Sequence, residues 1–144
     1  MSNPIKEFLV FWRIRHRLPG HRAFSIIGPR DARVNMKKVT ALFPNGLPTD
    51  PELQNQEWFA LYKKYEGERR VFYSQKAFLL TRDLTALTAA AVPLSFIGHL
   101  IAGSQWGGMA GYHLLLLMGM LLLISVSARN YGNRFVANVL IEAT

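Results

Sequence analysis

The chain has 144 residues, half of them hydrophobic, and its 17 lysines and arginines outnumber 9 acidic residues to give a net charge of +8. This length suits one small domain with a membrane-embedded part rather than two independent domains. There is no cysteine, which excludes disulfides, thiolate metal sites and cysteine nucleophiles.

The N-terminal stretch predicts a helix over residues 4–18. Asn3 and Pro4 suit its cap and first turn, and Pro19 ends it. Apolar residues fall on one face, and basic residues gather at its end. The residues expected to touch a membrane surface are Trp12, Arg13, Arg15 and Arg17. A helix lying in the membrane interface has this pattern, and a core helix with a solvated basic end is the open alternative.

Short elements are expected between this helix and the apolar part of the chain. They are a strand or extended link over 21–27, a helix over 30–43, a proline-rich loop over 44–51, and a helix capped by Asp50 that runs to about Tyr65. Gly67 is expected to separate that helix from the next, which covers 71–82 and continues into the first apolar run.

Two uncharged runs, residues 84–102 and 109–128, predict a transmembrane helical hairpin. They contain 19 and 20 residues. At about 1.5 Å per residue, each run comes close to the roughly 30 Å hydrocarbon thickness of a bilayer. The alternative is a buried hairpin of a soluble protein. The second run is apolar on every side, which disfavours that alternative because a soluble surface helix carries a polar face.

The basic residues set the expected orientation of this hairpin. Fifteen of the seventeen precede Asp83, and the other two are Arg129 and Arg134. By the positive-inside rule, both termini face the cytoplasm and only the turn at 104–108 reaches the other side. We therefore expect an integral membrane protein of a bacterial inner membrane.

The expected division of this all-α chain has three parts. They are a basic, mainly helical cytoplasmic region over 1–82, a transmembrane hairpin over 83–129, and an amphipathic cytoplasmic tail over 130–144. The tail is expected to continue the second span, to break at Gly132 and to pack against the N-terminal helices.

Folding the hairpin about Trp106 places two residue pairs opposite each other. Asp83 and Arg129 are expected to form a structural ion pair at the base of the hairpin. His99 and His113 are expected at one depth within it. These histidines either hydrogen-bond locally near the far interface or bind haem, a metal or a quinone. We expect no resident cofactor, and haem or a quinone at this pair is the alternative.

Small and hydroxyl residues mark the expected helix-packing positions. These are Thr85, Thr88, Ser95, Gly107, Gly111 and Gly119. Apolar surface gives no net drive for helix association in lipid, so small residues that allow close approach take that role. They suit packing within the hairpin as well as contact with a second copy.

The sequence contains no motif for soluble catalysis. It has no glycine-rich phosphate loop, no HExxH and no GxSxG. We therefore expect a non-enzymatic two-pass membrane protein that works by self-association or partner binding, as a scaffold or a membrane-perturbing effector. In architecture only, the layout is similar to small two-span effectors of bacterial defence systems.

The expected partners follow from the charge and the apolar runs. They are anionic lipid headgroups, and further copies of the chain or a larger membrane complex. The rival function is a small accessory subunit of a respiratory or transport complex in which His99 and His113 touch a cofactor. Nucleic acid is a weaker alternative, because an anionic leaflet explains the charge with fewer assumptions.

Overall fold

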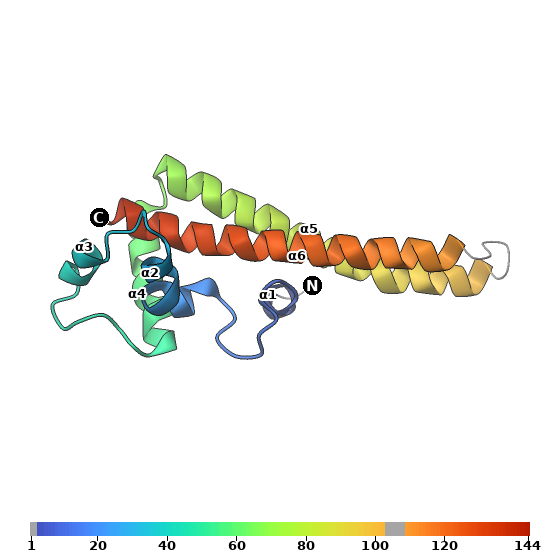
Figure 1. Ribbon diagram of the computed structural model, residues 1–144, viewed down its shortest axis with the longest axis horizontal. Helices are drawn as coiled ribbons and strands as arrows, with labels where there is room; N and C mark the ends of the chain where they lie inside the picture. Colours follow the sequence, from blue (N-terminus) through green and yellow to red (C-terminus); the bar gives the residue numbers. More distant parts are fainter. Residues whose placement is uncertain (1–2, 103–108) are drawn as a thin grey trace.

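Two long helices form the axis of the molecule. A computed structural model describes residues 3–102 and 109–144. Helices α5 (Arg69–Ala102) and α6 (Met109–Glu142) have 34 residues each and run side by side, and the shorter elements gather against one half of the pair (Figure 1). The described residues form helices, turns and loops without a strand. The predicted all-helical class with two long apolar helices is confirmed.

The shorter elements precede α5 in the chain. They are α1 (Asn3–Phe11), the 3-10 helix η1 (Pro19–Arg22), the π-helix η2 (Ala23–Ile27), α2 (Gly28–Arg30), α3 (Met36–Ala41) and α4 (Pro51–Tyr65). The predicted helix over 4–18 is too long. Trp12 and His16 have φ angles of 52° and 47°, a left-handed conformation that turns the chain away from the helix.

Residues 21–43 also differ from the prediction. The stretch expected as a strand or link forms the end of η1 and the whole of η2, and Ala23, Phe24 and Ile27 of η2 are buried in the core. The helix expected over 30–43 covers only α3. Its start is fixed by Asn35, whose side chain accepts a hydrogen bond from the Lys38 backbone N–H.

The boundaries of α4 and α5 are confirmed. The Asp50 carboxylate caps α4 by accepting hydrogen bonds from the backbone N–H groups of Glu52 and Leu53, both at 3.0 Å. Gly67 lies in the turn between α4 and α5. From there α5 continues without interruption from its polar start into its apolar half, as the sequence predicted.

The predicted break at Gly132 is wrong, because α6 is continuous to Glu142. Gly132 serves close packing instead. A Cβ atom at this position would lie 2.9 Å from Phe11 Cζ and 3.1 Å from Phe78 Cε2, so two aromatic rings rest directly on the helix backbone.

The core lies between the last part of α6 and the shorter elements. The Phe135 ring packs edge-on against Trp58 and Tyr62, with centroids 5.3 and 5.4 Å apart. The Trp58 indole N–H donates to the Val136 carbonyl oxygen at 3.4 Å. The predicted packing of the tail against the N-terminal region is therefore present.

The other half of the α5–α6 pair is a rod of two helices without further cover (Figure 1). Both helices are long and apolar enough to cross a membrane, yet only 17% and 11% of their most apolar stretches are buried. Large side chains such as Leu94, Ile101, Leu115 and Leu123 are exposed on the rod. A core helix of a soluble protein would bury such residues.

Candidate functional site at the base of the hairpin

Helix α1 crosses the hairpin where the bare rod begins. Figure 1 shows α1 end-on, whereas α6 runs along the picture, so α1 lies across the pair. The buried Ser125 hydroxyl on α6 donates to the Leu9 carbonyl oxygen at 2.7 Å. On α5, the Asp83 carboxylate accepts a hydrogen bond from the Lys6 ammonium at 2.9 Å. These contacts fix α1 where the charged part of the hairpin gives way to its uncharged part.

The two faces of α1 have different surroundings. Val10 and Phe11 are buried against the hairpin, whereas Ile5 and Phe8, together with Trp12 directly after the helix, are about half exposed. An outward apolar face on a helix that crosses two long apolar helices is the arrangement of an interfacial helix.

The four predicted membrane-surface residues lie at and after the end of α1. Trp12, Arg13 and Arg15 are exposed. Arg17 is held by the protein, because its guanidinium donates to the carbonyl oxygens of Ile14 at 3.0 Å and Pro4 at 2.9 Å. Arg17 therefore braces the turn, and the other three remain available to a surface.

The predicted ion pair between Asp83 and Arg129 is wrong. Asp83 pairs with Lys6 at 2.9 Å and with its neighbour Arg82 at 3.1 Å. The prediction rested on the register of two helices alone. It did not include α1, whose Lys6 binds the Asp83 carboxylate instead.

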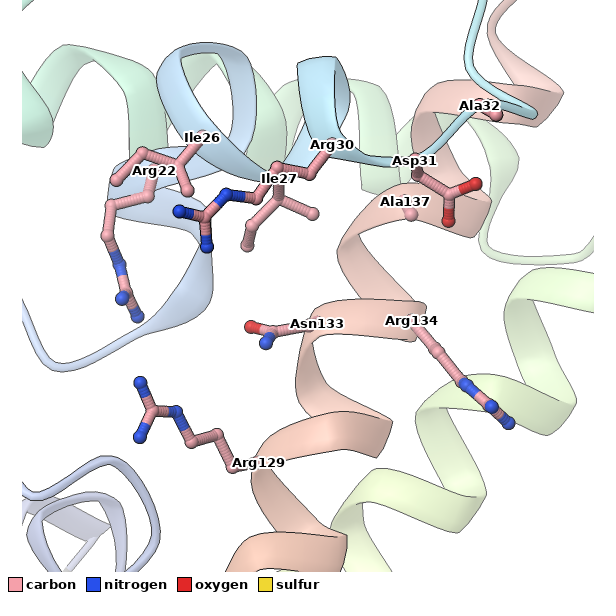
Figure 2. Close-up of a pocket in the computed structure, with 10 residues that line it drawn as sticks. All are labelled: Arg22, Ile26, Ile27, Arg30, Asp31, Ala32, Arg129, Asn133, Arg134 and Ala137. Atoms are coloured by element: carbon pink, nitrogen blue, oxygen red, sulfur yellow. The ribbon is translucent and has the colours of Figure 1, made fainter.

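Arg129 lines a cavity of about 310 Å³ beside α6. Figure 2 shows its lining, which combines four arginines with one carboxylate and smaller groups: Arg22, Ile26, Ile27, Arg30, Asp31, Ala32, Arg129, Asn133, Arg134 and Ala137. The guanidinium groups of Arg22 and Arg129 point toward each other across the opening, and the Asn133 amide points between them. We call this the arginine pocket.

The arginine pocket carries positive charge that the protein leaves largely uncompensated. Burial lowers the pKa of Arg22, and the positive charges of Arg13 and Arg129 lower it further. The Arg22 Nε atom is buried without a hydrogen-bond partner among the described residues. The one lining carboxylate, Asp31, is engaged by Arg33 at 2.9 and 2.7 Å, and this hydrogen bonding lowers the pKa of Asp31.

The chemistry of the arginine pocket suits an anion with several oxygens. Guanidinium groups bind phosphate and carboxylate oxygens through paired N–H donors. Arg129 directly follows the second uncharged run. The pocket therefore lies at the same end of the apolar rod as α1.

The predicted histidine pair is brought together within the rod. The His99 and His113 ring centroids are 5.6 Å apart, and the rings meet edge to face at 82°. Among the described residues, no third histidine or carboxylate joins them to form a metal-binding group.

The predicted helix-packing residues divide between two faces. Thr85 is fully buried, and Thr88 and Ser95 are partly buried. By contrast, a Cβ atom on Gly111 or Gly119 would meet nothing within 4 Å, so these glycines face outward. Gly107 lies outside the described residues.

Two groups of residues were not anticipated as sites. Arg22 joins Arg129 only because η1 packs beside α6. His16 and His21 converge on Glu52, which is 36 and 31 residues away from them in the chain. No local pattern in the sequence signals either grouping, because each depends on how residues 12–50 fold.

Comparisons with protein-family models, with curated proteins and with solved structures found no match. The geometry of the chain alone therefore supports the proposals below.

Proposed function

We propose that this chain is a non-enzymatic two-pass membrane protein that binds anionic headgroups at its surface and self-associates within the bilayer, as a scaffold or a membrane-perturbing effector. The observation that carries this proposal is the apolar rod, whose large side chains are exposed around two uncharged helices. A contiguous apolar surface of this extent marks a membrane or protein interaction site.

Lipid is the medium that best explains the rod. From residue 84 to residue 102, a helix rising about 1.5 Å per residue extends roughly 28 Å, close to the hydrocarbon thickness of a bilayer. Within the two uncharged runs the ionisable side chains are His99, His113 and Tyr112, whereas the lysines and arginines lie at the base of the rod or beyond. This distribution favours a cytoplasmic base and tail, because positively charged segments stay on that side.

The base of the rod supplies a membrane-surface layer. The exposed apolar residues Ile5 and Phe8 of α1, and Trp12 directly after it, would enter the boundary between headgroups and acyl chains. In the same layer, the arginine pocket would hold a lipid phosphate through Arg22 and Arg129.

Self-association is supported by the outward glycines. Thr85 is buried and Thr88 and Ser95 are partly buried, whereas Gly111 and Gly119 remain open to another helix. At about 3.6 residues per turn, the eight-residue step between them leaves the two glycines about 80° apart around the axis of α6, so both lie on its outward half. Such positions let a second helix approach closely in lipid.

Disulfide cross-linking tests self-association directly because the chain has no cysteine. A Gly119→Cys variant in native membranes is expected to give a dimer of cross-linked chains under mild oxidation. The matched control is Leu121→Cys, at nearly the same depth but on a less exposed position of α6, and it is expected to remain monomeric. Equal cross-linking of both variants, or a single-chain mass of the wild-type protein in nanodiscs, would contradict self-association.

A second candidate function rests on the histidine pair. Two imidazoles 5.6 Å apart inside apolar helices suit an accessory subunit of a respiratory or transport complex that touches haem or a quinone. This function predicts a cofactor absorption band in protein purified from native membranes, lost in His99→Ala or His113→Ala. Protein without such a band would exclude haem and favour the first proposal.

A further inference from the structure

His16, His21 and Glu52 form a cluster of three metal-ligating side chains. None of the three is among the residues that line the arginine pocket. The Glu52 carboxylate lies 3.0 Å from His16 Nδ1 through one oxygen and 3.3 Å from His21 Nε2 through the other. One ligand atom from each of the three side chains lies within 4.8 Å of the others. They come from the turn after α1, from η1 and from the first turn of α4.

The hydrogen bonding of His21 directs a lone pair into this cluster. Its Nδ1 lies 3.1 Å from the Leu18 carbonyl oxygen, which only accepts, so Nδ1 carries the proton. In the neutral ring, Nε2 then faces the Glu52 carboxylate as a second acceptor. Two acceptors at 3.3 Å repel each other unless a proton or a metal cation lies between them. An Nδ1–H bonded to a carbonyl is also the usual outer-shell contact of a metal-binding histidine.

The backbone at His16 contributes to the same convergence. Its φ of 47° is a left-handed conformation that non-glycine residues adopt infrequently and that recurs at functional sites. This turn brings the His16 ring to 5.3 Å from the His21 ring. Arg17, the next residue, is directed away to the carbonyl oxygens of Pro4 and Ile14.

We propose that His16, His21 and Glu52 bind one divalent transition-metal ion of the zinc class. Ligands at about 2.0–2.2 Å from a tetrahedral zinc ion stand roughly 3.3–3.5 Å apart. Each histidine separation, 3.0 Å to one Glu52 oxygen and 3.3 Å to the other, is close to that spacing. Two imidazoles favour zinc, copper or nickel over calcium or magnesium, which prefer oxygen ligands. Three protein ligands leave a fourth position for water.

The bound ion would join three segments that are separate in the chain. It would fix the turn after α1 and η1 to the first turn of α4, and so hold α1 in place across the hairpin. This role does not depend on self-association or on lipid binding.

A cobalt titration of the full-length protein in detergent, purified without a polyhistidine tag, tests the site. One Co²⁺ per chain is expected, with the intense visible bands of tetrahedral coordination, and Zn²⁺ is expected to displace it. Glu52→Gln and His16→Asn are each expected to weaken Co²⁺ affinity by at least about tenfold, since even outer-shell changes have effects of this size. The matched control, Glu57→Gln, removes the same charge from the same helix and is expected to bind as the wild type does.

Two controls keep the test decisive. His16→Asn changes an exposed residue and retains a side chain that tolerates left-handed backbone, so it reports on the site should Glu52→Gln unfold. His99→Ala is expected to leave binding unchanged, because that histidine belongs to the pair in the rod. The proposal is overturned if no saturable Co²⁺ or Zn²⁺ binding occurs, or if Glu52→Gln binds the ion as tightly as Glu57→Gln.

Discussion

Replacing Phe11 by alanine is expected to release α1 from the hairpin. The Phe11 side chain is 2% exposed. Its ring centroid lies 6.0 Å from that of Phe78, and it rests on the backbone of α6 at Gly132. Phe11→Ala removes this contact, and the two polar contacts of α1 remain.

The contacts of α1 differ in expected strength. Truncating a buried phenylalanine costs about 3–5 kcal/mol. The hydrogen bond from Ser125 to Leu9 contributes about 1 kcal/mol, and the partly exposed pair of Lys6 with Asp83 contributes about 0–1 kcal/mol. The equilibrium for opening α1 should therefore rise by roughly 100-fold to 4,000-fold in Phe11→Ala, at about 1.4 kcal/mol per tenfold.

Amide hydrogen exchange of α1 in nanodiscs measures this opening. Phe11→Ala should accelerate exchange of the α1 amides strongly, whereas Lys6→Met should change it by less than about tenfold. If Lys6→Met accelerates exchange as much as Phe11→Ala does, charge and not apolar packing holds α1 on the hairpin.

Three further variants each change one residue outside the apolar rod. Gln54→Leu should lower the free energy of unfolding by about 1–3 kcal/mol in thermal melts, because the buried Gln54 Oε1 accepts hydrogen bonds from two backbone N–H groups and a hydroxyl; an unchanged melting temperature would contradict it. Phosphatidylglycerol should raise the melting temperature of the wild type more than phosphatidylcholine does, and Arg129→Gln should reduce this difference. Arg69→Gln, which changes an exposed residue outside the pocket, should leave the difference unchanged. Equal stabilisation of both variants would exclude the arginine pocket as a lipid site. Asp31 has a folded-state pKa below 3.8 because of its Arg33 partner, so its contribution to stability is complete above that value and disappears as the pH falls through the folded pKa. Melts at falling pH should show less acid destabilisation in Asp31→Asn, and an identical pH profile would refute that assignment.

The sequence predicted the elements whose signals are local. The Asp50 cap, the break at Gly67 and the two long apolar helices each follow from neighbouring residues, and the structure contains them. Gly132 shows the limit of such signals. A glycine inside a helical pattern indicates a break or a close approach, and only the rings of Phe11 and Phe78 decide between these.

Contacts between distant segments were the part that local patterns missed. Asp83 was assigned the wrong partner because the position of α1 depends on the left-handed turn at Trp12 and His16. The convergence of His16, His21 and Glu52 depends on the same turn. By contrast, His99 and His113 were placed together correctly, since a hairpin of two straight helices fixes their register by counting.

The division of small residues between two faces also required the fold. Thr85 and Gly119 suit close helix contact equally well in the sequence. In the structure Thr85 is buried, whereas Gly119 faces outward. Which small residues remain for a partner depends on how the two helices are rotated about their axes.

Labelling of single cysteines shows whether the α5–α6 rod crosses a bilayer. Leu115→Cys and Leu123→Cys place a thiol at strongly exposed positions of the rod, and Arg15→Cys places one on the exposed turn after α1. In native membranes, a water-soluble maleimide is expected to label the cysteine at position 15 and to leave those at 115 and 123 unmodified until detergent is added. Equal labelling of all three without detergent would contradict a membrane-spanning rod.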